Sequence, residues 1–293
     1  MPKHLNILYS TLEGPQIGVG GIKSVLDGLM PALARLDDIS LSFVTPYFDV
    51  YDKSVNPDSP YEPSRIEQVA TVRHIYNGRI HETIVYRAIY QRISDTKCIF
   101  HYLLRPVSNS PVRRIFDIQN AKDMYQSFDH SMPLFRSIYF RTAVASMIRT
   151  HNVNIPTFDI VHSHSWPADV SMLVKEFANL QNYQELLQLA PGQTVKTLRP
   201  IPWTTTTVHM LIKGEDGRLT STDSVGNYIR SQGLPADFTQ RFPDQSAYIQ
   251  ESEFRQMAPT LTYCDATFMV SEGVTSDSIT GKGEGLDPLF LKL

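Results

Sequence analysis

Residues 5–51 read LNILYSTLEGPQIGVGGIKSVLDGLMPALARLDDISLSFVTPYFDVY, and this stretch decides the fold. Residues 5–10 predict a buried strand, and residues 39–48 predict a second apolar strand that ends in a proline-aromatic loop. Between them, residues 22–36 carry apolar side chains three or four positions apart, the spacing of one helix face. Pro31 lies inside this pattern and is expected to kink the helix or to end its first part. A strand, a glycine loop, a helix and a strand in this order open a doubly wound α/β sheet, whose ligands bind at the carboxyl ends of the strands.

The glycine loop contains Gly18, Gly20 and Gly21. Glycine lets backbone amides approach a sugar or a phosphate closely, because no Cβ intervenes. The spacing is not that of a dinucleotide fingerprint, since Lys23 stands where the third glycine would fall, and the G-K-[ST] ending of a P-loop is missing. Two interpretations stay open: a nucleotide or sugar site, and a tight turn from strand into helix.

Alternating strand and helix patterns continue along the chain and predict a parallel sheet with helices on both faces. An Asn-Gly pair at 77–78, between alternating apolar runs, predicts a β-hairpin inserted at about 69–104. A polar, loop-rich insertion is expected at about 213–241. The other expected elements are helices at 134–150, 167–180 and 244–263, strands at 158–164, 200–211 and 266–271, and a short helix at 272–280.

Composition places the chain among soluble globular proteins. Of its 293 residues 42% are hydrophobic, enough for the core of one large α/β domain, and the net charge of −3 gives no reason to expect nucleic-acid binding. The two cysteines, Cys98 and Cys264, are far apart in apolar surroundings and are expected to be buried thiols in a reducing compartment. No apolar run of about 18 residues predicts a membrane helix. We expect a cytoplasmic protein, with a plastid location open if a leader has been removed.

Three histidines are candidate site residues. His162 and His164 are two apart in a strand and could share a metal, but no third ligand stands at a suitable spacing, so a metal site is not expected. His164 and Trp166 fall at the carboxyl edge of the sheet, where ligands bind, although Trp166 equally suits a core aromatic or a helix-start contact. His209 ends an apolar strand after four threonines; it is a candidate catalytic residue or a histidine satisfied by the backbone.

Four segments, in order along the chain, resemble the bacterial glycogen synthases and plant starch synthases. They are GVGGIKSVLDGLMPALA with FVTPYFDVYD, FDIVHSHSW (158–166), WTTTTVHML (203–211), and YCDATFMVSEGVTSDSIT with GEGLDPLF (263–290). The resemblance implies the N-terminal half of a GT-B fold: residues 1–293 as one Rossmann-like domain, with no donor-binding domain after it. A C-terminal GT-B domain, in the same or another chain, is therefore an expected partner.

What the resemblance implies for function is transfer of glucose from ADP-glucose or UDP-glucose to an α-1,4-glucan, with retention of configuration. The nucleotide sugar would be a substrate, and no cofactor is expected. Gly20 and Gly21 would offer backbone amides to the diphosphate, and His209 would lie beside the transferred glucosyl unit.

Several positions depart from the family pattern. Gly18 stands where the family has a phosphate-binding lysine, and Ser24 and Ser165 stand where it has aspartates. Met210 replaces an asparagine. Lys23 could substitute in part for the lysine, although its helical position directs it elsewhere. A catalytically silent glucan-binding or regulatory partner built on the same half-fold is therefore the alternative, and altered donor or acceptor specificity is a third reading.

Overall fold

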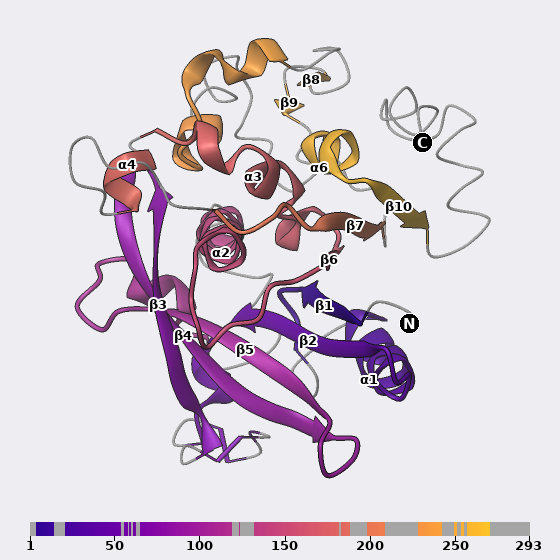
Figure 1. The fold of residues 1–293 in the computed structure, drawn as a ribbon. Helices are drawn as coiled ribbons and strands as arrows, with labels where there is room; N and C mark the ends of the chain where they lie inside the picture. Colours follow the sequence, from indigo (N-terminus) through magenta and orange to yellow (C-terminus); the bar gives the residue numbers. More distant parts are fainter. Residues whose placement is uncertain are drawn as a thin grey trace.

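The computed structural model describes residues 4–14, 21–53, 56–57, 59, 61–62, 65–118, 123, 132–181, 183–187, 198–208, 228–241, 249–250, 253–254 and 257–269. Within these ranges, one large sheet carries helices on both faces (Figure 1). The expected short helix at 272–280 lies outside the described residues. So does most of the polar segment 213–241, of which residues 228–241 are described.

The large sheet has eight strands and is mostly parallel. Six neighbouring strands run parallel, in the order β10 (Ala266–Met269), β7 (Trp203–Val208), β6 (Ile160–His164), β1 (Leu5–Ser10), β2 (Ile39–Pro46) and β5 (Cys98–Pro106). Beyond β5, the sheet continues with the antiparallel strands β4 (Arg79–Arg92) and β3 (Glu67–Tyr76). The prediction of a Rossmann-like, mostly parallel α/β fold with an inserted hairpin is confirmed.

The hairpin turn is formed by Asn77 and Gly78, whose φ angles are 49° and 69°. Two consecutive positive φ angles are what a two-residue type I′ turn requires, and Asn-Gly adopts them readily. The hairpin predicted from this pair is therefore confirmed. The hairpin formed by β3 and β4 ends at Arg92, before the expected end at residue 104. The following strand, β5, also pairs with β2 in parallel and so belongs to the main sheet.

Helices cover the two faces of the sheet (Figure 1). On one face, α1 (Gly21–Ala34) packs Leu26 and Met30 against Phe43 of β2 in a small core. The opposite face is covered by α2 (Met132–Arg149), α3 (Ser171–Lys175) and α6 (Met257–Tyr263), and the larger core lies between these helices and strands. The remaining short elements are η1 (Asp49–Tyr51), η3 (Arg113–Phe116), η5 (Trp166–Ala168), η6 (Phe177–Asn179), α4 (Tyr183–Leu186), η7 (Ala236–Arg241), β8 (Ile249–Gln250) and β9 (Glu253–Phe254).

The central helix α2 is buried from residue 136 to residue 149, although it contains arginines. A buried charge is tolerated when hydrogen bonds replace its water. Arg136 Nε donates to the Ile115 carbonyl oxygen at 2.7 Å, and an Arg141 guanidinium nitrogen donates to the Tyr228 hydroxyl at 2.7 Å. The helix predicted at 134–150 is confirmed, and these bonds explain how it enters the core on all sides.

Three predicted helices differ from the observed ones. α1 continues through Pro31 to Ala34, so the proline does not end the helix. The segment 167–180 is divided into η5, α3 and η6, and Asp169 marks the break, where its carboxylate accepts a hydrogen bond from Ser171 Oγ at 2.7 Å. Among the described residues of the segment 244–263, α6 is helical, whereas β8 and β9 are short strands; the start of α6 suits Pro259, which is tolerated in a first turn.

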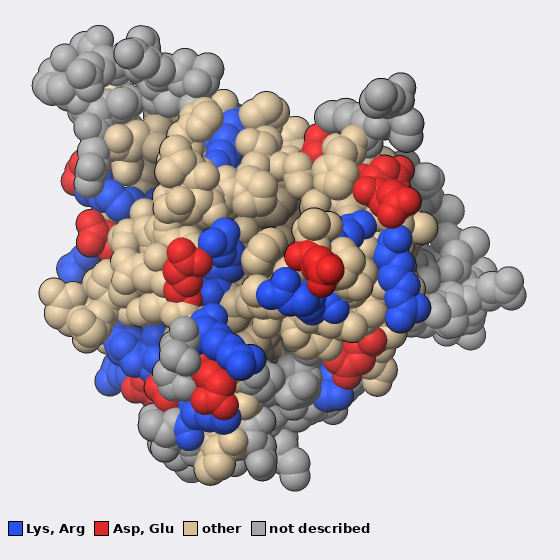
Figure 2. All heavy atoms as spheres, turned by 60° about the horizontal axis from the view of Figure 1, so that its bottom comes forward, with Lys and Arg blue, Asp and Glu red and all other residues tan. Residues whose placement is uncertain are grey.

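Acidic and basic side chains alternate over the face shown in Figure 2, without an extended area of one sign. This distribution agrees with the small formal net charge of −3. Within the part of the chain that the structure describes, no helix has the length and apolarity needed to cross a membrane.

Gly233 and Gly28 make a matched pair of tests of this packing. Gly233 has φ +85°, and a Cβ there would lie 2.8 Å from Ile75 Cβ of β3, whereas a Cβ on Gly28, on the exposed side of α1, would meet nothing within 4 Å. We expect Gly233→Ala to lower the free energy of unfolding by at least about 2 kcal/mol, through left-handed strain and overpacking. Gly28→Ala should raise it by about 0.5–1 kcal/mol. Urea unfolding measures both, and a Gly233→Ala variant as stable as the wild type would contradict the packing of Gly233 on β3.

Candidate active site

The strand order reverses beside β1, where α/β folds bind ligands. From β1 the chain passes through α1 to β2 on one side, and it later returns through α2 to β6 on the other side of β1. The carboxyl ends of β1 and β6 are therefore the expected ligand-binding edge. We refer to residues 10–14 and 164–168, which end or follow these strands, as the β1/β6 edge.

Buried hydroxyl groups hold the β1/β6 edge together. Ser10 Oγ donates a hydrogen bond to the Ala168 carbonyl oxygen at 2.7 Å and so joins the end of β1 to η5. Thr11 Oγ1 donates to the Glu13 carbonyl oxygen at 3.0 Å and closes the turn that follows β1. The two segments are thus fastened to each other before the chain enters the glycine loop.

Glu13 places a carboxylate at this edge, only 3% exposed, directly before the glycine loop. The next residue, Gly14, has no space for a side chain, because a Cβ would collide with the Tyr51 hydroxyl. Burial, and to a smaller extent the charge of Glu13, raises the pKa of Tyr51. Sequence reasoning missed Glu13; an acidic residue between a buried strand and a glycine loop was the signal that could have found it.

His164 ends β6 at the edge where the sequence placed it, and it is 2% exposed. Its ring forms a cluster with those of Tyr9 and His162, whose centroids lie 5.7 Å and 5.2 Å from its own and 4.8 Å from each other. Burial raises the pKa of Tyr9 to about 12, so the phenol next to His164 is neutral at physiological pH. His164 is accordingly a wall of the β1/β6 edge, packed against aromatic neighbours.

His162 lies on the same face of the sheet and bonds to β7 through both ring nitrogens. Nδ1 is 2.8 Å from Thr205 Oγ1, and Nε2 is 2.9 Å from Thr207 Oγ1. Both nitrogens are thereby occupied and neither is available to a metal. The described residues contain no group of three or more His, Cys, Asp or Glu side chains that could hold a metal ion.

The glycine-loop candidates divide into two groups. Gly18 and Gly20 lie outside the described residues, and Gly21 is the first residue of α1. Lys23, in the first turn of α1, pairs with Asp27 through a 2.7 Å contact between Nζ and Oδ2. Asp27 also accepts a hydrogen bond from the Tyr90 hydroxyl at 3.2 Å. The Lys23 ammonium is therefore directed along its own helix.

Ser165 turns the chain out of β6 with an unusual backbone conformation. Its φ is +60°, in the left-handed region that few non-glycine residues adopt. Its amide donates to the Thr207 carbonyl oxygen at 3.0 Å, so the turn is tied to β7. Trp166 begins η5 directly after this turn. Ser165 therefore sets the direction in which the chain leaves the β1/β6 edge.

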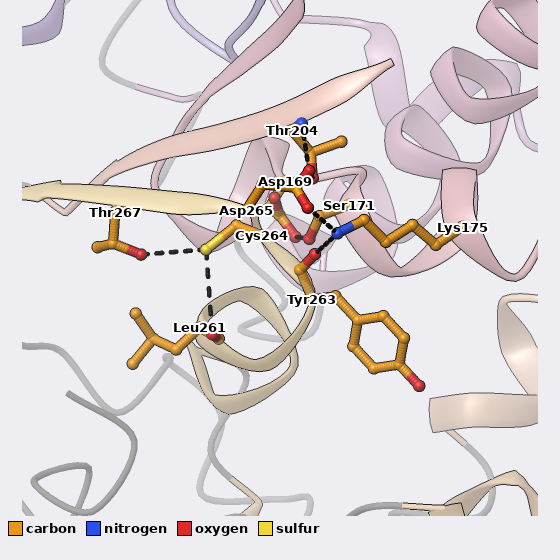
Figure 3. Close-up of polar contacts among 9 residues, drawn as sticks. All are labelled: Asp169, Ser171, Lys175, Thr204, Leu261, Tyr263, Cys264, Asp265 and Thr267. Carbon is orange, nitrogen blue, oxygen red and sulfur yellow. Dashed lines mark hydrogen bonds and ion pairs between the residues drawn. The ribbon is translucent and has the colours of Figure 1, made fainter. Parts of the chain in front are cut away.

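A clamp around Asp265 fixes the strand β7, which ends just before His209 (Figure 3). Asp265 accepts hydrogen bonds from the Thr204 amide at 2.7 Å, from Thr204 Oγ1 at 2.9 Å and from Lys175 Nζ at 2.7 Å. Lys175 also donates to the Tyr263 carbonyl oxygen at 2.5 Å, which brings α3, α6, β7 and β10 together. His209 itself lies outside the described residues.

The two cysteines are both free thiols, but only one is buried as predicted. Cys264 is buried beside the Asp265 clamp, with Sγ 3.0 Å from Thr267 Oγ1, and burial raises the pKa of its thiol to about 12 (Figure 3). Cys98 is half-buried at the start of β5, so the prediction of a buried thiol is wrong there. Its place at the amino end of an inner strand exposes it, although its sequence neighbours are apolar.

The end of β2, next to β1, is fastened by His101 of β5. Thr45 Oγ1 lies 2.7 Å from His101 Nε2, and the Tyr61 hydroxyl bonds to His101 Nδ1. Burial holds the pKa of His101 well below its ordinary value, so the ring is neutral. Thr45 Oγ1 also bonds to the Pro46 carbonyl oxygen at 3.1 Å, so both ring nitrogens of His101 and the end of β2 belong to one hydrogen-bond network.

The geometry suits a ligand with a phosphate and a polar, uncharged part. The N-terminus of α1, a helix of 14 residues, offers backbone amides and a partial positive charge to a phosphate. Glu13 and His164 supply a carboxylate and an imidazole at the neighbouring strand ends. Both side chains are almost entirely screened from solvent.

Comparison with known families gives one match. A family model described as the starch synthase catalytic domain matches residues 6–188. The matched span includes β1, α1, β6 and both halves of the β1/β6 edge, while β7, His209 and the segment 263–290 follow it. A comparison with curated proteins finds no match.

Ser165 supplies the first test of this site. Ser165→Val should lower the free energy of unfolding by about 1–3 kcal/mol, because a β-branched residue is strained at positive φ, whereas Ser165→Asn should be neutral or slightly stabilising. Ser94→Val, in an exposed turn without positive φ, is the control. Urea unfolding measures the free energy of unfolding of the three variants. Equal midpoints for Ser165→Val and the wild type would exclude the left-handed turn.

The Asp265 clamp predicts a pH dependence. Burial alone would raise the pKa of Asp265, but the hydrogen bonds from Lys175 and Thr204 outweigh it and lower the pKa. A lowered pKa means that the clamp stabilises the fold above the unfolded value of about 4 and is lost as pH falls through the folded value. Asp265→Asn should therefore cost about 1–2 kcal/mol at pH 7.

The difference between Asp265→Asn and the wild type should shrink toward pH 3, and urea unfolding at pH 7, 5 and 3 measures it. Asp95→Asn, in an exposed turn, is the matched control. A difference that stayed constant over this range would show that the carboxylate charge is not what holds β7.

Proposed function

The chain belongs to the family of starch synthase catalytic domains, and from this membership we propose that it transfers a glucosyl unit from a nucleotide sugar to an α-1,4-glucan. Glycosyl transfer is the general activity of the family. The donor, ADP-glucose or UDP-glucose, and the glucan acceptor are part of our proposal. We also propose that residues 1–293 form one Rossmann-like domain, which acts with a C-terminal GT-B domain in the same chain or in another.

The observation that carries the proposal is the reversal of strand order at the β1/β6 edge, next to the start of α1. In such a fold a diphosphate binds at the amide groups of the first helix, and the sugar lies over the strand ends. We assign the backbone amides of Gly20 and Gly21 to the diphosphate and His209 to the glucosyl unit. The support for His209 is its position: it follows Val208, the last residue of β7, and β7 pairs with β6 directly beside His164.

These groups would position the sugar and stabilise the charges of the transition state. As the bond to the sugar breaks, positive charge develops on the sugar ring and negative charge on the departing nucleotide diphosphate. The backbone amides at the start of α1 would stabilise the negative charge on the departing diphosphate. A histidine beside the sugar holds its hydroxyls or ring in the reactive orientation.

One observation favours the alternative of a silent, glucan-binding partner. Gly18 carries no charge, and Lys23 is paired with Asp27 at 2.7 Å, so neither of these two positions offers a free cation to the diphosphate. The backbone amides would then act without the lysine that the family pattern supplies. Whether they suffice is a question of turnover, which the following experiment measures.

The test is transfer of labelled glucose from ADP-glucose and from UDP-glucose to maltoheptaose by the full-length protein, with maltoheptaose binding measured by calorimetry. We expect His209→Ala to lower turnover by about a hundredfold, the cost of removing one group that stabilises the transition state. His151→Ala, at an exposed residue after α2, should leave it unchanged. Glucan binding without any transfer would establish the silent partner, and full turnover in His209→Ala would refute the role of His209.

A further inference from the structure

A polar pocket lies at the opposite end of the sheet from the β1/β6 edge. Its volume is about 360 Å³, within the range of small-ligand sites. Asn6, Ser40 and Ser42 line it from the amino-terminal parts of β1 and β2, and residues 153–158 close it from the side. Asn6 is four residues from Ser10 along β1, which puts the two sites about 13 Å apart at a rise of 3.3 Å per residue.

We infer that this pocket, which we call the amino-edge pocket, binds a neutral sugar unit. The inference does not depend on glycosyl transfer, since none of the residues that line the pocket belongs to the β1/β6 edge. It rests on three properties of the pocket: a pre-formed wall, a lining of rings and uncharged polar groups, and a balanced charge.

The loop 152–158 forms a wall that is already ordered by hydrogen bonds. The buried Arg199 guanidinium donates to the carbonyl oxygens of Asn152, Ile155 and Pro156 at 2.5, 2.6 and 2.8 Å. Asn154 Nδ2 donates to the Val69 carbonyl oxygen at 3.0 Å, which ties the loop to β3. Because the wall is held without a ligand, binding would cost little conformational entropy.

The lining combines aromatic rings with hydroxyl and amide groups. Phe100 and Tyr102 of β5 and Phe158 of the loop supply the rings, and the Tyr102 and Phe158 rings meet edge-on with centroids 6.3 Å apart. The side chains of Asn6 and Ser42 supply hydrogen-bond donors and acceptors. A pyranose ring has the same two characters, apolar C–H faces and a rim of hydroxyls, so it matches both parts of this lining.

Charge in the pocket is balanced, which favours an uncharged ligand over a phosphate. The one cationic side chain among the residues that line it is Arg87 of β4. Its guanidinium pairs with Glu67 of β3 at 2.8 Å and lies over the Phe100 ring at 5.2 Å from the centroid. An anion would have to compete with Glu67, whereas sugar hydroxyls need only hydrogen bonds.

Cys98 provides a direct probe, since its half-buried thiol lines the pocket. The other cysteine, Cys264, is buried with a thiol pKa of about 12 and should not react. We would measure the rate of Cys98 alkylation by neutral iodoacetamide, by intact mass spectrometry of the full-length protein. Maltose should slow the reaction at least fivefold with half-saturation at millimolar concentration, and inorganic phosphate should leave the rate unchanged.

Controls separate pocket binding from other effects. Cys98→Ser should abolish the signal, which assigns it to Cys98. Arg87→Gln should weaken the protection by maltose, whereas Arg79→Gln, an exposed arginine at the start of β4 and far from Cys98, should retain it. The inference is overturned if maltose gives no protection, if phosphate protects as well as maltose, or if a folded Arg87→Gln variant is protected like the wild type. Loss of glucosyl transfer in His209→Ala with intact Cys98 protection would show that the two sites are independent.

Discussion

Burial of α2 over residues 136–149 is the constraint on which the rest of the structure depends. The polar side chains of a buried helix need hydrogen-bond partners within the protein, and those partners become fixed in turn. At its N-terminal end, Ser137 Oγ donates to the Pro167 carbonyl oxygen at 2.6 Å, directly behind the β1/β6 edge. At its C-terminal end, Arg149 donates to the Arg199 carbonyl oxygen at 2.5 Å, and Arg199 holds the wall of the amino-edge pocket. One helix thus supports the two ends of the sheet.

Several polar side chains near the ends of the strands fix the fold and are not left free for a ligand. Lys175 and Lys23 each neutralise a carboxylate, of Asp265 and Asp27, and so serve packing. His101 is neutral and engaged at both nitrogens. Among the described groups named here, the backbone at the start of α1 is what remains for the anionic ligand that we propose. Because position 18 is glycine, turnover is the property that tests this proposal.

Features set by neighbours in the sequence could be predicted from it. The Asn77–Gly78 hairpin, the strand at 5–10 and the helix over 134–150 follow from local turn chemistry and periodicity, and the structure contains all three. Predictions failed where one residue interrupted the periodicity, or where exposure depended on the place of a residue in the sheet. The pattern at 167–180 reads as one helix, but Asp169 bonds to Ser171 and interrupts it. Cys98 has apolar neighbours in sequence, yet the amino edge of the sheet leaves it half-buried.

By itself, the sequence determined the fold class, the β-α-β opening with its glycine loop, and the position of His164 at a strand end, since periodicity and turn propensity act over a few residues. Only the tertiary structure decided that Glu13 is buried beside this edge and that a pocket exists at the far end of the strands. Both depend on distances between segments remote in sequence, whereas the pair of Lys23 and Asp27 is local, at positions i and i+4 of one helix. The physical reason is that burial is a property of the packed chain, and no local pattern encodes it.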